Sequence, residues 1–512
     1  MSARLLMIAL DGADSERLER WSDDGRLPNL ARLRQRGITR SLATPFGASD
    51  DSLWASFQYG IDESTHGRVF RRGALSSGRM GDNILDEANR DAFWHRLSAE
   101  GMRVAVLDVP KSPQPRAING IHLADWLVHG KYHKQPQSHP PSLADEVLAR
   151  FGPPPPSMCG HFQEAPTDLW VSQFIGNLRA SIAQKLAAAL HYLTAEPWDL
   201  FVVGFKEGHC SGHGLWNFVD RDHPEFDEAR SLRLAWPVEQ IFQGLDSAIG
   251  DLIAGAGPEA EVVVFTTTRM EPTGSIDHLM PQVVLRLNAA LSGRPAPWLD
   301  QAYERLKLSL PGRPAGWLTR AWGRLHRGMP VPGPVTQLRG SDNCGALRLN
   351  AGESSDPQNR VRLLREIGNL LTELVDEETG APVATKITYP STQHEGPRAA
   401  SLPDILMHYR SALVPRTIRS ARLGRIGGRR RRRRPGNHAV GGLAIVDGPI
   451  STSCGAELTR LEDFTALACR VLEVLPNPIV DPMPHRLNHG PSEIGPGEDR
   501  GVILWQSSTL AE

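Results

Sequence analysis

The stretch RLLMIALDGAD, residues 4–14, is a short apolar run followed by two acidic residues. A nearly continuous apolar run of this length is typical of a parallel strand that is covered on both faces of a sheet. Three further runs have the same character, namely RVAVLDV at residues 103–109, DLFVVGF at residues 199–205 and EVVVFT at residues 261–266. We therefore predict that these segments are buried parallel strands.

Helical stretches are predicted between these strands, at residues 15–36, 91–101, 167–194 and 232–256. Alternation of strands and helices is typical of an α/β fold with a central, mostly parallel sheet and helices on both faces. We expect one such domain over residues 1–512. Residues 295–340 are rich in Trp, Arg and Pro and are predicted to form a cap or insertion, and residues 416–436 to form a flexible basic loop.

The overall composition excludes some classes of partner. The formal net charge is -1 and the pI is about 7.0, so nothing draws the whole chain to nucleic acid or to an anionic membrane. No apolar run reaches the ~18 residues that a spanning helix needs, and the N-terminus lacks a secretory pattern. The 5 cysteines are scattered and odd in number, which favours free thiols and a cytoplasmic location.

Candidate functional residues follow the predicted strands. Asp11 comes directly after the first strand, and the segment GFKEGHCSGHGLW places His209 and His213 directly after the third. Ligands of open α/β sheets bind at the carboxyl ends of the strands. Two histidines four residues apart share one face of a helix and can bind one metal ion, although two polar loop histidines would give the same pattern. His438, in the segment GNHAVGGLAIVDGP, is uninformative alone.

Taken together and in order, these motifs resemble one family. Six segments are similar to motifs of type I phosphodiesterase/nucleotide pyrophosphatase-like proteins. They are the opening segment, LWASFQYGIDESTHGRVF at residues 53–70, GFKEGHCSGHGLW, DNCGALRLNAGE at residues 342–353, GNHAVGGLAIVDGPI and LEDFTALACRVLEVLPNP. That family lies in the alkaline-phosphatase superfamily. The matches run over almost the whole chain, so the resemblance implies an alkaline-phosphatase-like fold.

The resemblance also implies a site for two metal ions, usually zinc. The first ion would be held by His209, His213 and His438, with His209 where the family has an aspartate. Asp11 matches the second position, but Thr267 and Thr268 stand where the family has an Asp-His pair, and neither is a good zinc ligand. We therefore expect one zinc ion, a doubtful second ion, and manganese as the alternative metal.

The family's nucleophile position falls on Asp50, with Ser49 and Ser52 beside it. Three sources of attack stay open: a serine hydroxyl, the Asp50 carboxylate, and water activated at the metal. The resemblance thus predicts a metal-dependent phosphoester hydrolase, of phosphodiesterase or pyrophosphatase type, that acts on a small-molecule phosphoester with a partly degenerate two-metal site. The alternative is a catalytically impaired pseudoenzyme that binds an anionic ligand or a protein partner.

Several further residues are weaker candidates. Loop histidines could contact a substrate, although solvated loop positions are the simpler interpretation: His129, His139 and His161. Asp277 and His278 form an Asp-His pair about ten residues beyond the position that the family uses. The arginine run at residues 429–434 is interpreted either as a solvated segment or as an anion-binding flap at the mouth of the site.

Overall fold

The computed structural model describes most of the chain. The described residues are 3–44, 49–68, 72–74, 80–82, 91–128, 133, 135–156, 165–295, 298–310, 314, 317–318, 321, 333–338, 343–350, 356–428 and 434–475.

The centre of the molecule is an eight-stranded sheet with the order β2-β19-β9-β1-β8-β5-β6-β7. The segments predicted as strands form β1 (Ala3–Leu10), β5 (Val104–Leu107), β8 (Trp198–Phe205) and β9 (Glu261–Thr266). These strands and β6 (Gly120–Ala124) are parallel to one another. Antiparallel pairing adds β19 (Gly442–Asp447) with β2 (Ile38–Leu42) at one edge and β7 (Gln137–His139) at the other. The predicted mostly parallel sheet is confirmed.

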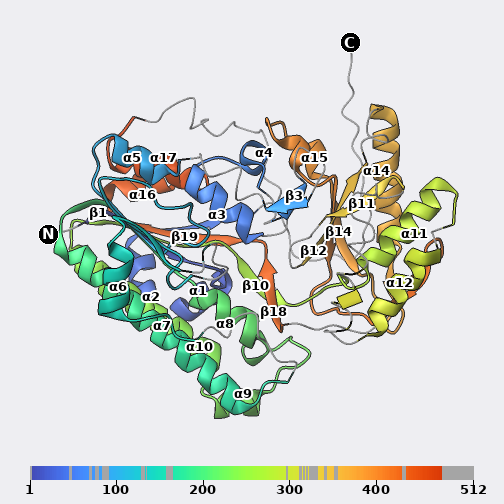
Figure 1. The fold of residues 1–512 in the computed structure, drawn as a ribbon. Coiled ribbons are helices and arrows are strands. Elements are labelled where there is room, and N and C mark those ends of the chain that lie inside the picture. The colour runs from blue at the N-terminus through green and yellow to red at the C-terminus, as the bar shows by residue number, and fades with distance from the viewer. Residues whose placement is uncertain are drawn as a thin grey trace.

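Helices cover both faces of this sheet (Figure 1). On one face a hydrophobic core joins the sheet to α1 (Ser15–Asp23), α2 (Pro28–Arg36), α7 (Asp168–Ala195), α8 (Glu207–Leu215) and α10 (Pro237–Ala256). A second core on the opposite face includes α3 (Asp50–Tyr59), α5 (Phe93–Ala99) and α17 (Asp463–Val471). The helix predicted over residues 15–36 is two helices, because Gly25 adopts a positive φ of 74° and Pro28 starts a new first turn.

A separate hydrophobic core lies beside the sheet, at the right of Figure 1. It is built on a four-stranded sheet, with β12 (Cys344–Leu349) between β11 (Val335–Leu338) and β15 (Ile405–Tyr409), and β14 (Ala384–Thr388) at the edge. Its helices are α11 (Met280–Ser292) and α14 (Pro357–Thr372), and α12 (Trp298–Ser309) packs against α11. Two of these elements, α12 and β11, come from residues 295–340, the segment predicted as a cap or insertion.

Part of the predicted basic loop is regular structure. Strands β16 (Thr417–Ser420) and β17 (Gly424–Gly427) form an antiparallel hairpin. The reason is that Ile418 and Ile426 are cross-strand partners and are buried in the separate core beside the sheet, which holds the hairpin in place. The remaining elements are α4 (Glu63–His66), β3 (Arg72–Ala74), β4 (Met80–Asp82), α6 (Leu143–Phe151), η2 (Trp216–Phe218), α9 (Glu228–Arg233), β10 (Arg269–Pro272), β13 (Val375–Asp376), α15 (Pro390–Gln393), η3 (Ala399–Ser401), β18 (Gly436–Ala439) and α16 (Pro449–Gly455).

The cysteines differ in part from the prediction of free thiols. Cys344 and Cys469 are buried thiols outside any disulfide, but Cys210 is disulfide-bonded, so the prediction is wrong for Cys210. A disulfide forms when folding brings a second sulfur close, which spacing along the sequence does not reveal. The expectation of a cytoplasmic location rested on free thiols and on the lack of a secretory pattern, and the disulfide at Cys210 removes the first of these supports. No helix in the described part of the chain is long and apolar enough to cross a bilayer.

Candidate metal centre

The turn after β1 is tied directly to helix α8. The backbone N–H of His209 donates to the carbonyl of Asp11 at 2.9 Å, and the N–H of Asp11 donates to the carbonyl of Phe205 at 2.7 Å. Gly12 makes this approach possible, because it has a φ of 55° and a Cβ there would lie 2.9 Å from the Cβ of His209. The LDGAD turn therefore holds Asp11 and His209 side by side at the carboxyl edge of the sheet.

Three histidine rings meet beside this turn. Helix α8 places His209 and His213 on one face, with ring centroids 4.4 Å apart, and β18 brings His438 to 4.7 Å from His209 and 4.6 Å from His213. Each ring offers one nitrogen, and these nitrogens lie within 4.8 Å of one another. Close packing of β18 on α8 needs Gly436, since a Cβ there would lie 2.1 Å from the carbonyl oxygen of Gly212.

His213 has the protonation state that a metal ligand needs. Its Nδ1 lies 2.9 Å from the carbonyl oxygen of Gly436. A carbonyl only accepts, so Nδ1 carries the proton and Nε2 keeps its lone pair. Burial, then the positive charge of Arg434 and of the neighbouring histidines, holds the pKa of His213 well below its usual range. Among the residues that the structure describes, nothing hydrogen-bonds to Nε2 of His213.

Asp50 faces the histidines from the first turn of α3. Its Oδ1 lies 3.0 Å from Nδ1 of His438 and its Oδ2 3.7 Å from Nδ1 of His209. Burial alone would raise the pKa of Asp50, but the charges of His438 and His209 outweigh burial and hold it well below its usual range. Asp50 is therefore a carboxylate that is stabilised by positive charge in front of it.

A second group of possible ligands adjoins the first. Oxygens of Asp11 and Asp50 and a nitrogen of His209 lie close enough to share an ion, and Oδ2 of Asp11 is 3.4 Å from Nδ1 of His209. Trp54 fixes the other oxygen of Asp11, since its Nε1–H donates to Oδ1 at 2.9 Å. This second group has only one histidine, and that histidine also belongs to the first group.

The two residues after β9, where the resemblance led us to expect an Asp-His pair, are threonines and offer no strong metal ligand. Thr267 and Thr268 are completely buried, and their hydroxyl oxygens have no hydrogen-bond partner within the described part of the chain. The alternative Asp-His pair, Asp277 and His278, is outside both groups of possible metal ligands. Asp277 accepts a hydrogen bond from the hydroxyl of Tyr409 at 2.7 Å, and Nε2 of His278 lies 3.1 Å from the carbonyl oxygen of Pro415. These contacts hold Asp277 and His278 against the separate core that is built on the four-stranded sheet.

The two serines near Asp50 differ in their surroundings. Ser52 is fully buried and its hydroxyl donates to Oε1 of Glu63 at 3.1 Å. Ser49 is the N-cap residue of α3 and is also buried, without a side-chain capping bond. Among the other candidates, His139 lies on edge strand β7, whereas His129, His161 and residues 429–433 fall outside the described residues.

Two cations beside Asp50 were missed from the sequence. Lys111 and Arg68 lie 3.5 Å and 3.4 Å from Oδ1 of Asp51, and both are largely buried. They offset the charge of Asp51 near the start of α3. No local pattern reveals this pairing, because the partners are seventeen or more residues apart and Lys111 is positioned by a positive φ of 54°.

Asn343 is a second residue that the sequence did not single out. Its Nδ2 donates to the backbone carbonyl of His438 at 2.7 Å, and its Oδ1 accepts from Nδ2 of Asn437 at 2.5 Å. Asn343 thereby ties the strand that carries His438 to the start of β12. The segment DNCGALRLNAGE was noticed only as a strand, although an Asn before a strand is a signal for such a backbone contact.

A buried pair of glutamates behind α3 makes stability depend on pH. Burial, followed by the charge of Glu462, raises the pKa of Glu63 to about 8, and burial raises that of Glu462 to about 7. Arg460 lies between them, with Nη2 3.6 Å from Oε2 of Glu63 and Nε 2.5 Å from Oε1 of Glu462. Near neutral pH the folded protein therefore retains protons that the unfolded chain has released.

We expect the free energy of unfolding to fall as pH rises from about 4.5, the ordinary pKa of glutamate, to about 8. Glu63→Gln should remove part of this slope, so that the variant matches the wild type at pH 5 and exceeds it by more than ~1 kcal/mol at pH 8.5. Urea unfolding across this range measures the effect. Exposed Glu378→Gln is the control, and an identical slope in wild type and Glu63→Gln would contradict the assignment.

The residues present fit a zinc ion at the three-histidine group. Imidazole nitrogens are preferred zinc ligands, and a buried Nε2 with a lone pair and no protein partner is the state that coordination requires. His213 meets this condition, and the carbonyl of Gly436 orients it from behind, as backbone carbonyls commonly do for ligating histidines. The group at Asp11 fits a second ion less well, because His209, its one histidine, also belongs to the first group.

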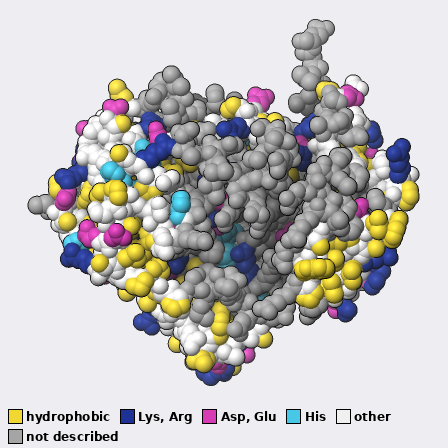
Figure 2. Space-filling view, in the orientation of Figure 1, with side chains coloured by type: hydrophobic (Ala, Val, Ile, Leu, Met, Phe, Trp, Pro, Cys, Tyr) yellow, Lys and Arg dark blue, Asp and Glu magenta, His cyan; other side chains and the backbone are white. Residues whose placement is uncertain are grey.

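In space-filling view, histidine side chains are visible in a hollow near the middle of one face (Figure 2). No family model matches the chain. No curated protein matches it in sequence either. Among solved structures, phosphonoacetate hydrolase from Sinorhizobium meliloti, in complex with phosphonoformate, is similar, with a TM-score of 0.52, 12% identity and coverage of 92% of this chain and 96% of the other.

Murine ectonucleotide pyrophosphatase/phosphodiesterase 5 is also similar, with a TM-score of 0.47, 11% identity and coverage of 93% of this chain and 96% of the other. The human protein of the same name gives a TM-score of 0.46 and 12% identity, with coverage of 93% and 96%. At such low identity the likeness to phosphonoacetate hydrolase establishes the fold. The chain has the alkaline-phosphatase-like fold that its motifs imply.

Proposed function

We propose that this chain, which has the alkaline-phosphatase-like fold, is a metal-dependent hydrolase of small-molecule phosphoesters, of phosphodiesterase or pyrophosphatase type. The observation that carries the proposal is the group of three buried histidines, with ligand nitrogens within 4.8 Å of one another, at the carboxyl edge of the sheet. A carboxylate, Asp50, faces the same group from a helix N-terminus. The similarity of fold is consistent with such a hydrolase, but the proposal is based on the chemistry of the site.

His209, His213 and His438 would hold one zinc ion, and manganese is the alternative metal. When bound, the ion would offset negative charge on the phosphoryl group and polarise one of its oxygens. Asp11 would support a second, weaker ion together with Asp50 and His209. Because Thr267 and Thr268 replace the usual Asp-His pair, we expect the two positions to differ strongly in metal affinity.

The chain's own residues would supply binding and positioning. Backbone N–H groups at the start of α3 are available to an anionic phosphate. Lys111 and Arg68 would keep Asp51 from repelling it. Asp50, at the family's nucleophile position, would contact the reacting phosphoryl group or the ion. The hydroxyl of Ser52 donates to Glu63, whereas Ser49 is the N-cap residue of α3 and makes no side-chain capping bond.

The test is a panel of aryl phosphate monoesters and diesters, assayed with added zinc or manganese. We expect metal-dependent hydrolysis of a diester such as bis(p-nitrophenyl) phosphate, lost on chelation and restored by zinc. Sample purity is controlled by assaying His213→Ala prepared in parallel, because a contaminant would be active in both samples. Equal activity in both would refute the proposal.

A specific observation favours one alternative. The buried threonines after β9 and the aspartate at the nucleophile position suit a pseudoenzyme that binds an anionic ligand or a protein partner without turnover. Metal content separates the two: about one zinc per chain supports the hydrolase, and none after equilibration with zinc supports the pseudoenzyme.

A further inference from the structure

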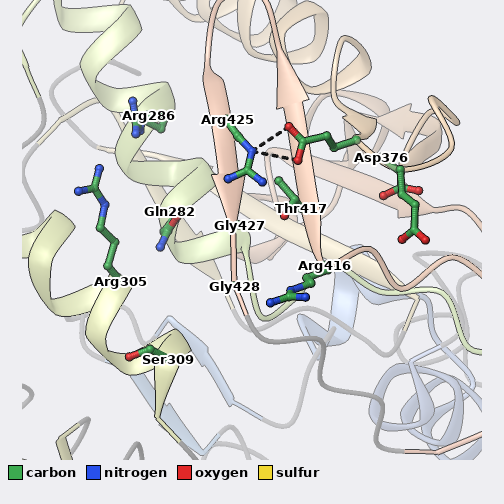
Figure 3. A pocket seen from close by; sticks show the side chains of 12 residues that line it. Gln282, Arg286, Arg305, Ser309, Asp376, Arg416, Thr417, Arg425, Gly427 and Gly428 are labelled. Carbon is green, nitrogen blue, oxygen red and sulfur yellow. Dashed lines mark hydrogen bonds and ion pairs between the residues drawn. The ribbon is translucent and has the colours of Figure 1, made fainter.

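A cavity of about 1320 Å³ lies beside the core that is built on the four-stranded sheet. Helices α11 and α12 form one wall, and the β16–β17 hairpin forms the other (Figure 3). Its lining includes Arg286 on α11, Arg305 on α12, Arg416 just before β16 and Arg425 on β17. The five residues placed at the metal centre, Asp11, Asp50, His209, His213 and His438, are absent from this lining.

Four arginines and three carboxylates line this cavity, and the carboxylates are Asp376, Glu377 and Glu378. Arg425 is neutralised, since its Nε donates to both carboxylate oxygens of Glu377 at 2.8 and 2.9 Å. Asp376 is buried and accepts from the hydroxyl of Thr379 at 2.6 Å. In the described portion of the structure, the remaining three arginines form no ion pair with a carboxylate: Arg286, Arg305 and Arg416. Three guanidinium groups from separate elements thus line one cavity without a carboxylate partner, so each can donate to an anionic ligand.

An unsatisfied donor lies on the same wall. Gln282 precedes Arg286 by four residues on α11, so both side chains occupy one face of the helix. Its Nε2 is buried and has no hydrogen-bond partner among the described residues. A buried amide without a partner is costly, so this nitrogen fits a ligand that brings an acceptor into the cavity.

We propose that this cavity binds a small-molecule anion that carries two or more phosphate groups. Guanidinium groups bind phosphate through paired N–H donors, and three arginines on three elements match several anionic groups better than one. The volume exceeds the ~300–1,000 Å³ typical of small-molecule sites, which leaves room for a diphosphate with an organic substituent. The proposal stands independently of hydrolysis, since the two sites share no residue.

The test uses methylenediphosphonate, which resists hydrolysis, and methylphosphonate as a probe with one anionic group. By isothermal titration calorimetry at physiological salt, the diphosphonate should bind at least ~10-fold more tightly than methylphosphonate, because it engages more than one arginine. Each of Arg286→Gln, Arg305→Gln and Arg416→Gln should weaken diphosphonate binding at least ~10-fold. Arg416→Lys should recover part of the loss, since it keeps the charge.

Controls separate this cavity from other anion sites. Arg362→Gln changes an exposed side chain of α14, and this variant should bind as the wild type does. His213→Ala should keep full affinity even if it loses hydrolysis. Unchanged binding in the combined Arg286, Arg305 and Arg416 variant would overturn the proposal. So would loss of binding only in His213→Ala, or only after residues 429–433 are replaced by Gly and Ser, because the ligand would then occupy the metal centre or the arginine run.

Discussion

His213→Ala is expected to lower the affinity for zinc by at least ~100-fold and to abolish metal-dependent hydrolysis. The reason is that His213 offers a buried Nε2 with a lone pair, fixed by the bond from Nδ1 to the carbonyl of Gly436. Loss of residues that merely orient a ligand costs 10–100-fold in metal affinity, so loss of the ligand itself should cost more. Zinc content after equilibration with a competing chelator, together with diester hydrolysis, measures both effects.

Two controls make this result specific. Thr268→Ala removes a buried hydroxyl at the second metal position and should leave the zinc content nearly unchanged. His139→Ala removes a partly exposed histidine on edge strand β7 and should change neither zinc content nor activity. If His213→Ala and Thr268→Ala lose zinc equally, the asymmetry between the two metal positions is wrong.

The sheet was predictable because its central strands are buried on both faces. Residues 199–205 and 261–266 are continuous apolar runs, and they became β8 and β9 with bounds that differ by at most one residue. The helix over residues 15–36 was too long because its apolar pattern continues across the break at Gly25 and Pro28. The hairpin of β16 and β17 was missed because its arginines dominate the composition, while the two buried isoleucines that pin it are eight residues apart.

Less of the site was predictable from local pattern. His209 and His213 stand out because they follow a strand and are four residues apart. His438 was named only through a family resemblance, since one histidine before a strand carries no signal. Asn343, Lys111 and Arg68 act through contacts between distant segments, and such contacts depend on tertiary packing that a single sequence does not contain.

Asp50→Asn is expected to lower hydrolysis at least ~100-fold, a loss typical of a group that acts directly on the transition state. The Asp50 carboxylate lies 3.0 Å from Nδ1 of His438 and 3.7 Å from Nδ1 of His209, and its pKa lies well below its usual range, so Asp50 is ionised. Asparagine has nearly the same shape but lacks the charge. By contrast, Ser49→Ala and Ser52→Ala should retain most activity. The hydroxyl of Ser52 donates to Glu63, and Ser49 is the N-cap residue of α3, with no bond to the histidines among the described contacts.

Zinc content measured on the same samples separates the roles of Asp50. If Asp50→Asn keeps its zinc while kcat falls, Asp50 acts on the phosphoryl group, as a nucleophile does; if zinc falls in parallel, Asp50 holds the ion. Loss of turnover in Ser49→Ala or Ser52→Ala instead would identify a serine hydroxyl as the nucleophile. Asp50→Thr tests whether a hydroxyl serves better at this position, so activity above the wild type in this variant would mean that the aspartate impairs catalysis and would support the pseudoenzyme interpretation.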